Sequence, residues 1–209
     1  MTGRIQIFAK APFPGLAKSR LIPALGAGRA ADLQAHFIRH TLTTTAQLKL
    51  FTELWCAPDI NHPAFAAAVR DFSVELCTQE GGDLGARMSH ALEYGIARGG
   101  PVVLIGTDCP ALAAADLQEA FDALCSGHDA VLGPAADGGY YLIGLNGPGP
   151  QLFHRMQWST HHVLNETRAR LRSSNMHWHE LRQLSDIDTP ADLIDLPDIL
   201  KQAIAYELA

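Results

Sequence analysis

The sequence has few cysteines, no long apolar run and no excess of positive charge. Its four cysteines are scattered over 209 residues and form no C-x-x-C pair. This pattern argues against a disulfide framework or a zinc ribbon and is typical of reduced thiols. No apolar segment reaches the length of a membrane span, and the N-terminus shows no signal-peptide pattern. We therefore expect a cytoplasmic protein with no membrane span.

Positive charge is in deficit, with 16 Lys and Arg residues against 22 Asp and Glu residues and a formal net charge of −6. That balance argues against a nucleic-acid or anionic-membrane surface, although it leaves room for a local cationic site. An apolar content of 47% and a charged content of 18% are typical of a globular protein. No linker-like stretch is present, so we expect one domain over residues 1–209.

Several familiar motifs are also missing. The chain contains no G-x-x-x-x-G-K-[ST] P-loop, no G-x-G-x-x-G dinucleotide fingerprint and no H-E-x-x-H zinc motif. The histidine pairs at 161–162 and at 177 and 179 have no nearby cysteine, which favours surface or core histidines over zinc ligands. A nucleotide site, if present, must therefore be built in another way.

Strand-like and helix-like stretches alternate along the chain. We predict strands at 5–10, 50–57, 73–78, 101–106, 130–133, 140–145 and 176–181, and helices at 28–48, 63–70, 86–97, 114–125 and 160–172, with a last helical region from Thr189 and Pro190 onward. This order predicts a three-layer α/β/α sandwich around a mostly parallel sheet. Ligands in such sheets bind at the carboxyl ends of the strands, near a switch in strand order.

The first such strand end carries cations. Strand 5–10 ends at Lys10, a loop with two prolines and Gly15 follows, and Lys18 and Arg20 come next. Loop N–H groups and fixed cations are a common means of holding phosphates. The alternative is a surface turn with two solvated cations. On the first interpretation, Lys10, Gly15, Lys18 and Arg20 bind the substrate.

The end of the most apolar strand, 101–106, carries an acid. Asp108 follows this strand, where a carboxylate can hold Mg²⁺ or Mn²⁺ together with water and substrate phosphates. The alternative is that Asp108 caps the next helix or closes a turn before Pro110. We predict that Asp108 is a metal ligand.

A second acidic pair, Asp186 and Asp188, precedes the last helical region. The two are separated by one apolar residue, so an extended chain places both carboxylates on one side. Thr189 and Asp192 suffice to cap the following helix, which leaves Asp186 and Asp188 free for another role. We predict that they share an ion with Asp108.

Two glycine-containing loops are further candidates. The stretch Asp137, Gly138, Gly139, Tyr140 is a strong turn signal, and its glycines would let backbone approach a ligand closely. Asp137 and the tyrosine offer acceptor and stacking groups for a sugar or similar polyol. The loop at 81–87 leads into a helix and could also contact a base or ribose through Gly82, Asp83 and Arg87.

Six motifs together resemble a known family. The segments are FAKAPFPGLAKSRL, GGDLGARM, VVLIGTDCPAL, LGPAADGGYYLIGL, WSTHHVLNET and DIDTPADL. In this order they resemble the glycosyltransferase-like bacterial family called transferase 1 of radical-SAM/selenodomain gene clusters, over nearly the whole chain. The resemblance implies the GT-A type fold of the nucleotide-diphospho-sugar transferase superfamily. A more distant likeness is to 2-phospholactate and molybdenum-cofactor guanylyltransferases.

The chain departs from these relatives at two points. A typical glycosyltransferase has D-x-D after the central strand, whereas this chain has Asp108, Cys109 and Pro110. The G-x-S-x-R-x-G loop of the molybdenum-cofactor enzyme is also missing. The resemblance therefore leaves glycosyl transfer and nucleotidyl transfer both open.

The resemblance implies roles for the candidate residues. Carried over from 2-phospholactate guanylyltransferases, the metal ligands are Asp108, Asp186 and Asp188. We expect a nucleotide or nucleotide-sugar donor, a small-molecule acceptor and Mg²⁺ or Mn²⁺, with Lys18 and Arg20 neutralising phosphates and Asp108, Asp137 and Lys18 as catalytic residues. His161 is an alternative base. The third alternative, a non-catalytic nucleotide-binding protein, would not need the three metal-site acids.

Overall fold

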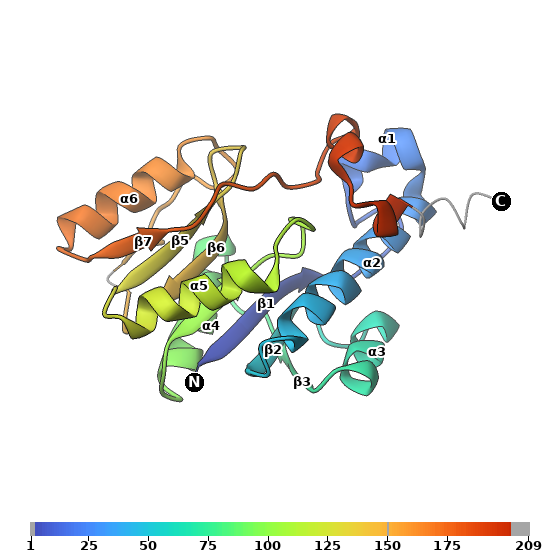
Figure 1. Cartoon of the computed structure of the whole chain (residues 1–209). Helices are drawn as coiled ribbons and strands as arrows, with labels where there is room; N and C mark the ends of the chain where they lie inside the picture. The colour runs from blue at the N-terminus through green and yellow to red at the C-terminus, as the bar shows by residue number, and fades with distance from the viewer. Residues whose placement is uncertain (1–2, 150, 202–209) are drawn as a thin grey trace.

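The computed structural model describes residues 3–149 and 151–201, and its centre is a seven-stranded sheet (Figure 1). The strand order is β3-β2-β1-β4-β6-β5-β7. The strands are β1 (Arg4–Lys10), β2 (Phe51–Ala57), β3 (Val74–Thr78), β4 (Val102–Ile105), β5 (Ala130–Pro134), β6 (Tyr140–Leu145) and β7 (Trp178–Glu180).

The sheet is parallel except at β6. This strand pairs antiparallel with both β4 and β5, while the other neighbouring strands are parallel. The chain builds β2 and β3 on one side of β1 and then crosses to place β4 on the other side. The strand order therefore switches between β1 and β4, where a crevice forms at the carboxyl ends of the two strands.

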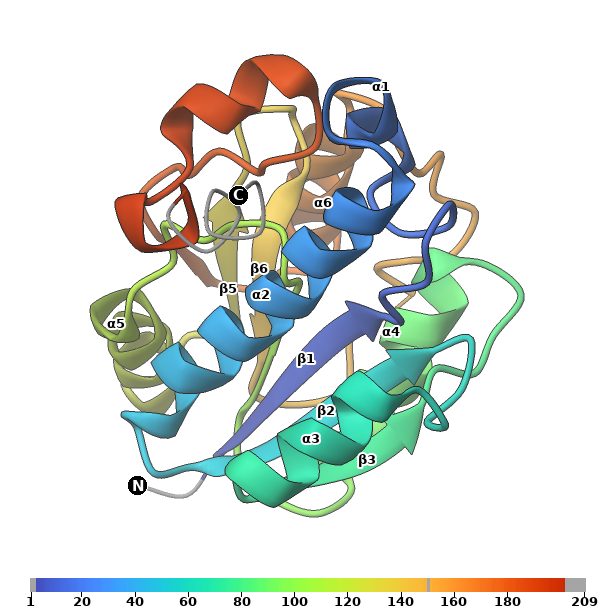
Figure 2. The same cartoon turned by 90° about the vertical axis from the view of Figure 1, so that its right-hand side faces the viewer.

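Helices cover both faces of the sheet, which makes the predicted three layers (Figures 1 and 2). One face packs against helices α2, α3 and α5, and the other against α4 and α6. The helices are α1 (Ile22–Leu25), α2 (Ala27–Ala46), α3 (Pro63–Asp71), α4 (Leu84–Ile96), α5 (Ala114–Cys125) and α6 (Val163–Ser173), with 3₁₀ turns η1 (Ser19–Leu21) and η2 (Pro190–Asp195).

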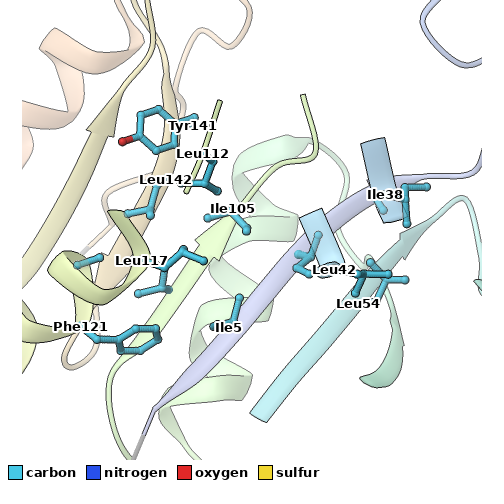
Figure 3. Packing of buried hydrophobic residues seen from close by; sticks show 14 of the residues in the cluster. Ile5, Ile38, Leu42, Leu54, Ile105, Leu112, Leu117, Phe121, Tyr141 and Leu142 are labelled. Carbon is cyan, nitrogen blue, oxygen red and sulfur yellow. The ribbon is translucent and has the colours of Figure 1, made fainter. Parts of the chain in front are cut away.

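The core follows from the alternation of side chains along the strands. In β4, Val103 and Ile105 face α2 and α5, while Val102 and Leu104 face α4. All four residues are buried because helices cover both faces of this central strand. Figure 3 shows part of the first of these layers, in which Ile105 lies near Leu112 and Leu142 and belongs to the same buried cluster as Leu42 of α2 and Leu117 of α5. A rigid sheet of this kind fixes the strand ends that carry the candidate site.

A third apolar cluster brings the C-terminal segment back to the start of the chain. Ile187, Leu196 and Leu200 pack with residues of η1 and α2, among them Leu21 and Phe37. Figure 2 accordingly shows η2 at the same end of the molecule as α1. This packing carries residues 186–188 to the carboxyl end of the sheet.

The predicted elements agree with the observed ones within two residues, except that helix α6 begins three residues later and the last helical region is of another type. Helix α6 begins at Val163 rather than at 160, because the Leu164 N–H donates to the Gly138 carbonyl and the preceding residues lie against that turn. The last helical region begins at Pro190 as expected but is a short 3₁₀ helix. Leu196 is extended, as is usual before a proline, and this ends the 3₁₀ helix.

In the described residues no helix is long and apolar enough to span a membrane.

Candidate functional site

A cavity of about 870 Å³ opens at the carboxyl ends of β1 and β4 and beside the start of β6. It lies at the switch in strand order and is large enough for a small-molecule ligand. Its walls bring together charged residues that are distant in the sequence: Lys10, Lys18, Arg20, Arg87, Asp108, Asp137, Asp186 and Asp188.

Lys18 is the most buried cation of this cavity. It adopts a left-handed backbone conformation with φ of 47°, and its side chain is only 3% exposed. Its Nζ lies 2.8 Å from Oδ1 of Asp108 and donates to the Ile187 carbonyl at 2.7 Å. A carboxylate oxygen of Asp188 lies 3.9 Å away. Lys18 therefore joins the end of β4 to the C-terminal segment.

Asp108 is held on one of its two oxygens. Besides Lys18, Thr107 donates from Oγ1 to Oδ1 of Asp108 at 3.3 Å, and Gln34 of α2 donates to Thr107 Oγ1 at 3.1 Å. Gln34 and Thr107 are both buried, whereas the Asp108 side chain is 49% exposed toward the cavity. The chain of hydrogen bonds fixes the carboxylate while leaving it accessible.

The C-terminal segment brings a second group of acids to the same place. The Ile187 N–H donates to the Asp108 carbonyl at 2.9 Å, and this bond holds the extended chain against the end of β4. The residues on either side, Asp186 and Asp188, both line the cavity, as their spacing predicted. Asp188 also forms an ion pair with Arg20, with 2.7 Å between Oδ2 of Asp188 and Nη1 of Arg20, and the Arg20 side chain is 67% exposed.

The following turn is capped without help from these acids. Asp192 accepts hydrogen bonds from the backbone N–H groups of Asp188 and Thr189 and from the Thr189 hydroxyl. The capping residues anticipated from the sequence are thus confirmed. The carboxylates of Asp186 and Asp188 have no part in the cap.

Asp186 lies among other acids and binds a proton more readily because of them. The pKa of Asp186 is raised, first by burial and then by the negative charges of Asp137, Asp188 and Asp108. The neighbouring Cys109 thiol has its pKa raised by burial and by Asp186 and Asp108, which makes it a poor nucleophile. A cation bound among these carboxylates would offset their mutual repulsion.

The donor set fits a hard divalent cation that shares its coordination with a ligand. In residues 3–149 and 151–201, no three His, Cys, Asp or Glu side chains stand close enough to form a complete protein site. Mg²⁺ commonly uses one or two carboxylates and completes its shell with water and phosphate oxygens. Asp108 with Asp186 or Asp188 would provide such a pair.

The opposite part of the cavity is apolar and aromatic. Its wall includes Phe8, Met88, Leu104, Tyr140 and Trp158. The Trp158 indole packs directly over Gly85 in the first turn of α4, where a Cβ atom would lie 2.7 Å from the ring. An apolar pocket beside a charged end is suited to a ligand with a flat ring and a phosphate chain.

The loop before α4 contributes less than the sequence suggested. Arg87 lines the cavity and donates from Nε to the Gly81 carbonyl at 3.1 Å. Asp83 is the N-cap of α4 and accepts from the Ala86 N–H at 2.8 Å. Asp83, Gly82 and Gly15 are not among the described residues that line the cavity. Asp83 thus has a structural role that its position alone explains.

The turn between β5 and β6 presents its two faces to different surroundings. Asp137 and Gly139 line the main cavity, and the Gly139 N–H donates to Asp137 Oδ1 at 2.8 Å. Gly138 has φ of 89° and lines a smaller cavity on the other side, against the backbone of His161. A side chain at Gly138 would collide with that backbone, so the glycine is required by packing.

Lys10 lies at the mouth of the cavity, where its exposed ammonium donates to the Leu16 carbonyl at 2.7 Å.

Other residues of the cavity wall were not predicted from the sequence, chiefly Gln34, Thr107 and Gln79. Gln34 carried a usable signal, because it is a polar residue within the apolar face of α2 that includes Leu33 and Phe37. Gln79 carried none, since its bonds to the Ala9 and Trp55 carbonyls depend on the assembled sheet.

Several solved structures have the same fold as this chain. A protein from Desulfovibrio desulfuricans G20, provisionally assigned as a nucleotide-diphospho-sugar transferase, is 34% identical with a TM-score of 0.84, over 90% of this chain and 84% of that chain. The 4-diphosphocytidyl-2C-methyl-D-erythritol synthase from Anaerococcus prevotii DSM 20548 is 10% identical with a TM-score of 0.63, over 100% and 96% of the two chains.

CMP:2-keto-3-deoxy-manno-octonic acid synthetase, solved with CTP, is 13% identical with a TM-score of 0.60, over 97% of this chain and 99% of that chain. Both of these more distant likenesses support the fold alone. A search of curated proteins gave no match. The neighbours are nucleotidyl or sugar transferases in kind, and the fold is that of the nucleotide-diphospho-sugar transferases, as the motifs implied.

The family model for "Uncharacterized protein conserved in bacteria (DUF2064)" matches residues 41–160. This span includes β4, Asp108 and the turn with Asp137. With more than half of the chain matched, the chain belongs to the DUF2064 family.

Proposed function

We propose that this protein is a metal-dependent transferase that takes a nucleotide-diphospho-sugar as donor and passes the sugar to a small-molecule acceptor in the cytoplasm. The observation that carries the proposal is the single cavity in which Asp108, Asp186 and Asp188 face the cations Lys18 and Arg20 at the switch between β1 and β4. The assignment of the 34% identical structure as a nucleotide-diphospho-sugar transferase supports it.

The phosphates of the donor belong at the charged end of the cavity. Arg20 is exposed and can turn from Asp188 toward a phosphate, since an exposed ion pair contributes little stability. Lys18 adds positive charge from behind Asp108. The base and sugar belong against the apolar wall with Tyr140 and Trp158 and beside Arg87.

Asp108 with Asp186 or Asp188 would hold Mg²⁺ or Mn²⁺. When bound, such an ion would stabilise the charge that develops on the leaving nucleoside diphosphate. The protein's own contribution is to fix the carboxylates and to hold cationic groups near the phosphates, which is electrostatic preorganisation. Asp137, placed on the turn that faces the cavity, is the candidate to accept a proton from the acceptor hydroxyl.

Nucleotidyl transfer is the second candidate. The absence of a second acid in a D-x-D arrangement after the central strand, where the chain has Asp108, Cys109 and Pro110, departs from a typical glycosyltransferase and keeps a triphosphate donor with release of pyrophosphate open. In that reaction the same residues would act on the α-phosphate. A nucleotide-binding protein without catalysis is the third alternative, and the retained acids argue against it.

Product analysis separates these alternatives. Purified protein is incubated with Mg²⁺ or Mn²⁺ and a panel of nucleotide sugars and nucleoside triphosphates, with pooled sugars, alcohols and phosphorylated small molecules as acceptors. Release of nucleoside diphosphate supports glycosyl transfer, and release of pyrophosphate supports nucleotidyl transfer. Metal-dependent binding without either product points to the non-catalytic alternative.

Donor binding is measured in parallel by thermal shift, because a ligand that binds only the folded state raises its apparent stability. Asp108→Asn is the test variant and Asp32→Asn, an exposed acid on α2, is the matched control. The proposal requires that Asp108→Asn lose the metal-dependent shift and that Asp32→Asn keep it.

A further inference from the structure

We infer that Lys18 is a built-in counter-cation for the aspartates of the cavity: it positions Asp108 and the 186–188 segment and does not itself bind phosphate. The sequence presents Lys18 and Arg20 as an equivalent pair, but the structure gives them different surroundings. The inference deepens the proposed function and rests on it only in treating the cavity as a cation site.

The contacts of Lys18 already use its ammonium group. It has three N–H donors, and its partners are Asp108 Oδ1 at 2.8 Å and the Ile187 carbonyl at 2.7 Å, with Asp188 Oδ1 at 3.9 Å. The ammonium also lies 5.0 Å from the centre of the Phe37 ring, a cation–π contact. Two of its three N–H groups thus hold partners on two separate segments, and a phosphate would have to compete with Asp188 for the third.

Arg20 has the opposite character. Its side chain is 67% exposed, and its ion pair with Asp188 is at the surface of the cavity. Breaking an exposed pair costs little, whereas removing one member of a buried pair leaves an uncompensated charge. Arg20 is therefore the cation free to follow a phosphate, and Lys18 is the fixed one.

The crowding of carboxylates explains why a fixed cation is needed there. Asp108, Asp137, Asp186 and Asp188 line one cavity, and the Ile187 N–H bond to the Asp108 carbonyl holds the 186–188 segment against the end of β4. The Lys18 ammonium stands between Asp108 and Asp188, on the side away from solvent. It offsets part of their repulsion before any other cation arrives, so the site can form in advance.

Thermal unfolding without nucleotide tests this role. Lys18→Met keeps most of the length of the unbranched side chain but removes its charge, and Lys18→Arg keeps the charge. The matched control is Lys49→Met, because Lys49 also has a left-handed backbone, with φ of 53°, but is exposed and is not among the residues that line the cavity. Each variant is melted with Na⁺ alone and with added Mg²⁺ at equal ionic strength.

We expect Lys18→Met to lower the unfolding midpoint in Na⁺ by at least ~6 °C, since it leaves Asp108 and Asp188 without their counter-charge and the Ile187 carbonyl without its donor. Mg²⁺ should then raise the midpoint of Lys18→Met at least twice as far as that of the parent, because the divalent ion replaces the lost counter-charge. Adding Asp108→Asn should remove this extra shift. Lys18→Arg and Lys49→Met should each show a Mg²⁺ shift close to that of the parent.

A different pattern overturns the inference. If Lys18→Met melts like the parent in Na⁺ and loses affinity for nucleoside diphosphate but not for nucleoside, Lys18 is a phosphate ligand. A large loss of stability with no extra Mg²⁺ response makes Lys18 an ordinary packing residue. If Lys18→Met folds only during refolding with Mg²⁺, the inference holds, and failure to fold in either salt contradicts it. None of these melts depends on turnover, so the proposed function can fail separately.

Discussion

Arg182 donates two hydrogen bonds to the carboxylate of Asp116, from Nε to Oδ1 at 2.6 Å and from Nη2 to Oδ2 at 2.8 Å. The Asp116 side chain is buried in the first turn of α5, and Arg182 follows β7. The Arg182 carbonyl also accepts from the Tyr141 hydroxyl at 3.0 Å. These contacts fix the chain just before Asp186, so an ion pair outside the cavity helps to position an acid inside it.

Arg182→Gln should therefore destabilise the protein by about 3 kcal/mol at neutral pH, because it leaves the Asp116 carboxylate buried with one partner fewer. Chemical denaturation measures the loss. Arg39→Gln is the control, since Arg39 forms an exposed pair with Asp71. That change should cost less than ~1 kcal/mol. Equal losses in the two variants would contradict the role given to Arg182.

The same pair predicts a pH dependence. Burial alone would raise the pKa of Asp116, but the hydrogen bonds from Arg182 and from the Ala113 N–H bring it below its ordinary value. A lowered pKa in the folded state adds stability above the unfolded-state value, about 3.9, and this stability is lost as the pH falls through the folded-state value. The difference between parent and Arg182→Gln should thus shrink in acid. A constant difference down to pH 2 would contradict it.

Asp186 should contribute a pH dependence of stability opposite in sign to that of Asp116. Its pKa is raised by burial and by the neighbouring acids, so the folded state binds its proton more readily than the unfolded state does. Metal-free protein therefore gains stability as the pH falls through the folded-state value of Asp186. Asp186→Asn should stabilise the metal-free protein above that value, with the gain vanishing in acid. Asp59→Asn, at an exposed loop position, is the control.

Arg20 separates phosphate recognition from binding of the nucleoside. One charge-assisted contact contributes roughly 1.5–3 kcal/mol, so Arg20→Gln should weaken binding of a nucleoside diphosphate ~10- to 150-fold. Binding of the nucleoside, measured by calorimetry at the same salt concentration, should be almost unchanged. Arg29→Gln, an exposed change on α2, should affect neither ligand. Equal loss for both ligands would assign Arg20 to packing.

Gly138 tests whether a glycine of the β5–β6 turn is held by packing. Its φ of 89° and its approach to the His161 backbone leave no room for a Cβ atom. Gly138→Ala should destabilise the protein by about 2 kcal/mol or more, because strain and a collision add together. Gly147→Ala should be near neutral, since no atom lies within 4 Å of a Cβ there. Similar unfolding midpoints for the two variants would refute the packing role.

Much of the fold could be predicted from the alternation of apolar and helical stretches. The pattern identified all seven strands, including the fully buried β4. The helix type of η2 was less predictable, because a capping residue followed by a proline can begin an α-helix or a 3₁₀ helix. The start of α6 was missed because it depends on the bond between Leu164 and Gly138, which only the folded chain brings together.

The site was predictable by residue type and less so by environment. Asp108 was identified because it follows the most apolar strand, and Asp186 and Asp188 because they exceed the needs of the cap. The burial of Lys18 could not be foreseen, since it depends on a carbonyl 169 positions away in the sequence. Local patterns reveal which groups are available, whereas long-range contacts decide which of them remain free to meet a ligand.

The shared metal and phosphate site is tested most directly by diffraction from crystals containing Mn²⁺ and a nucleoside diphosphate. We predict one anomalous peak in the cavity, at a coordination distance of about 2.0–2.2 Å from Asp108 and from Asp186 or Asp188, with phosphate oxygens in the same shell. Arg20 should contact a phosphate, and Lys18 should keep its bond to Asp108. An anomalous peak outside coordination distance of all three aspartates would contradict the central claim.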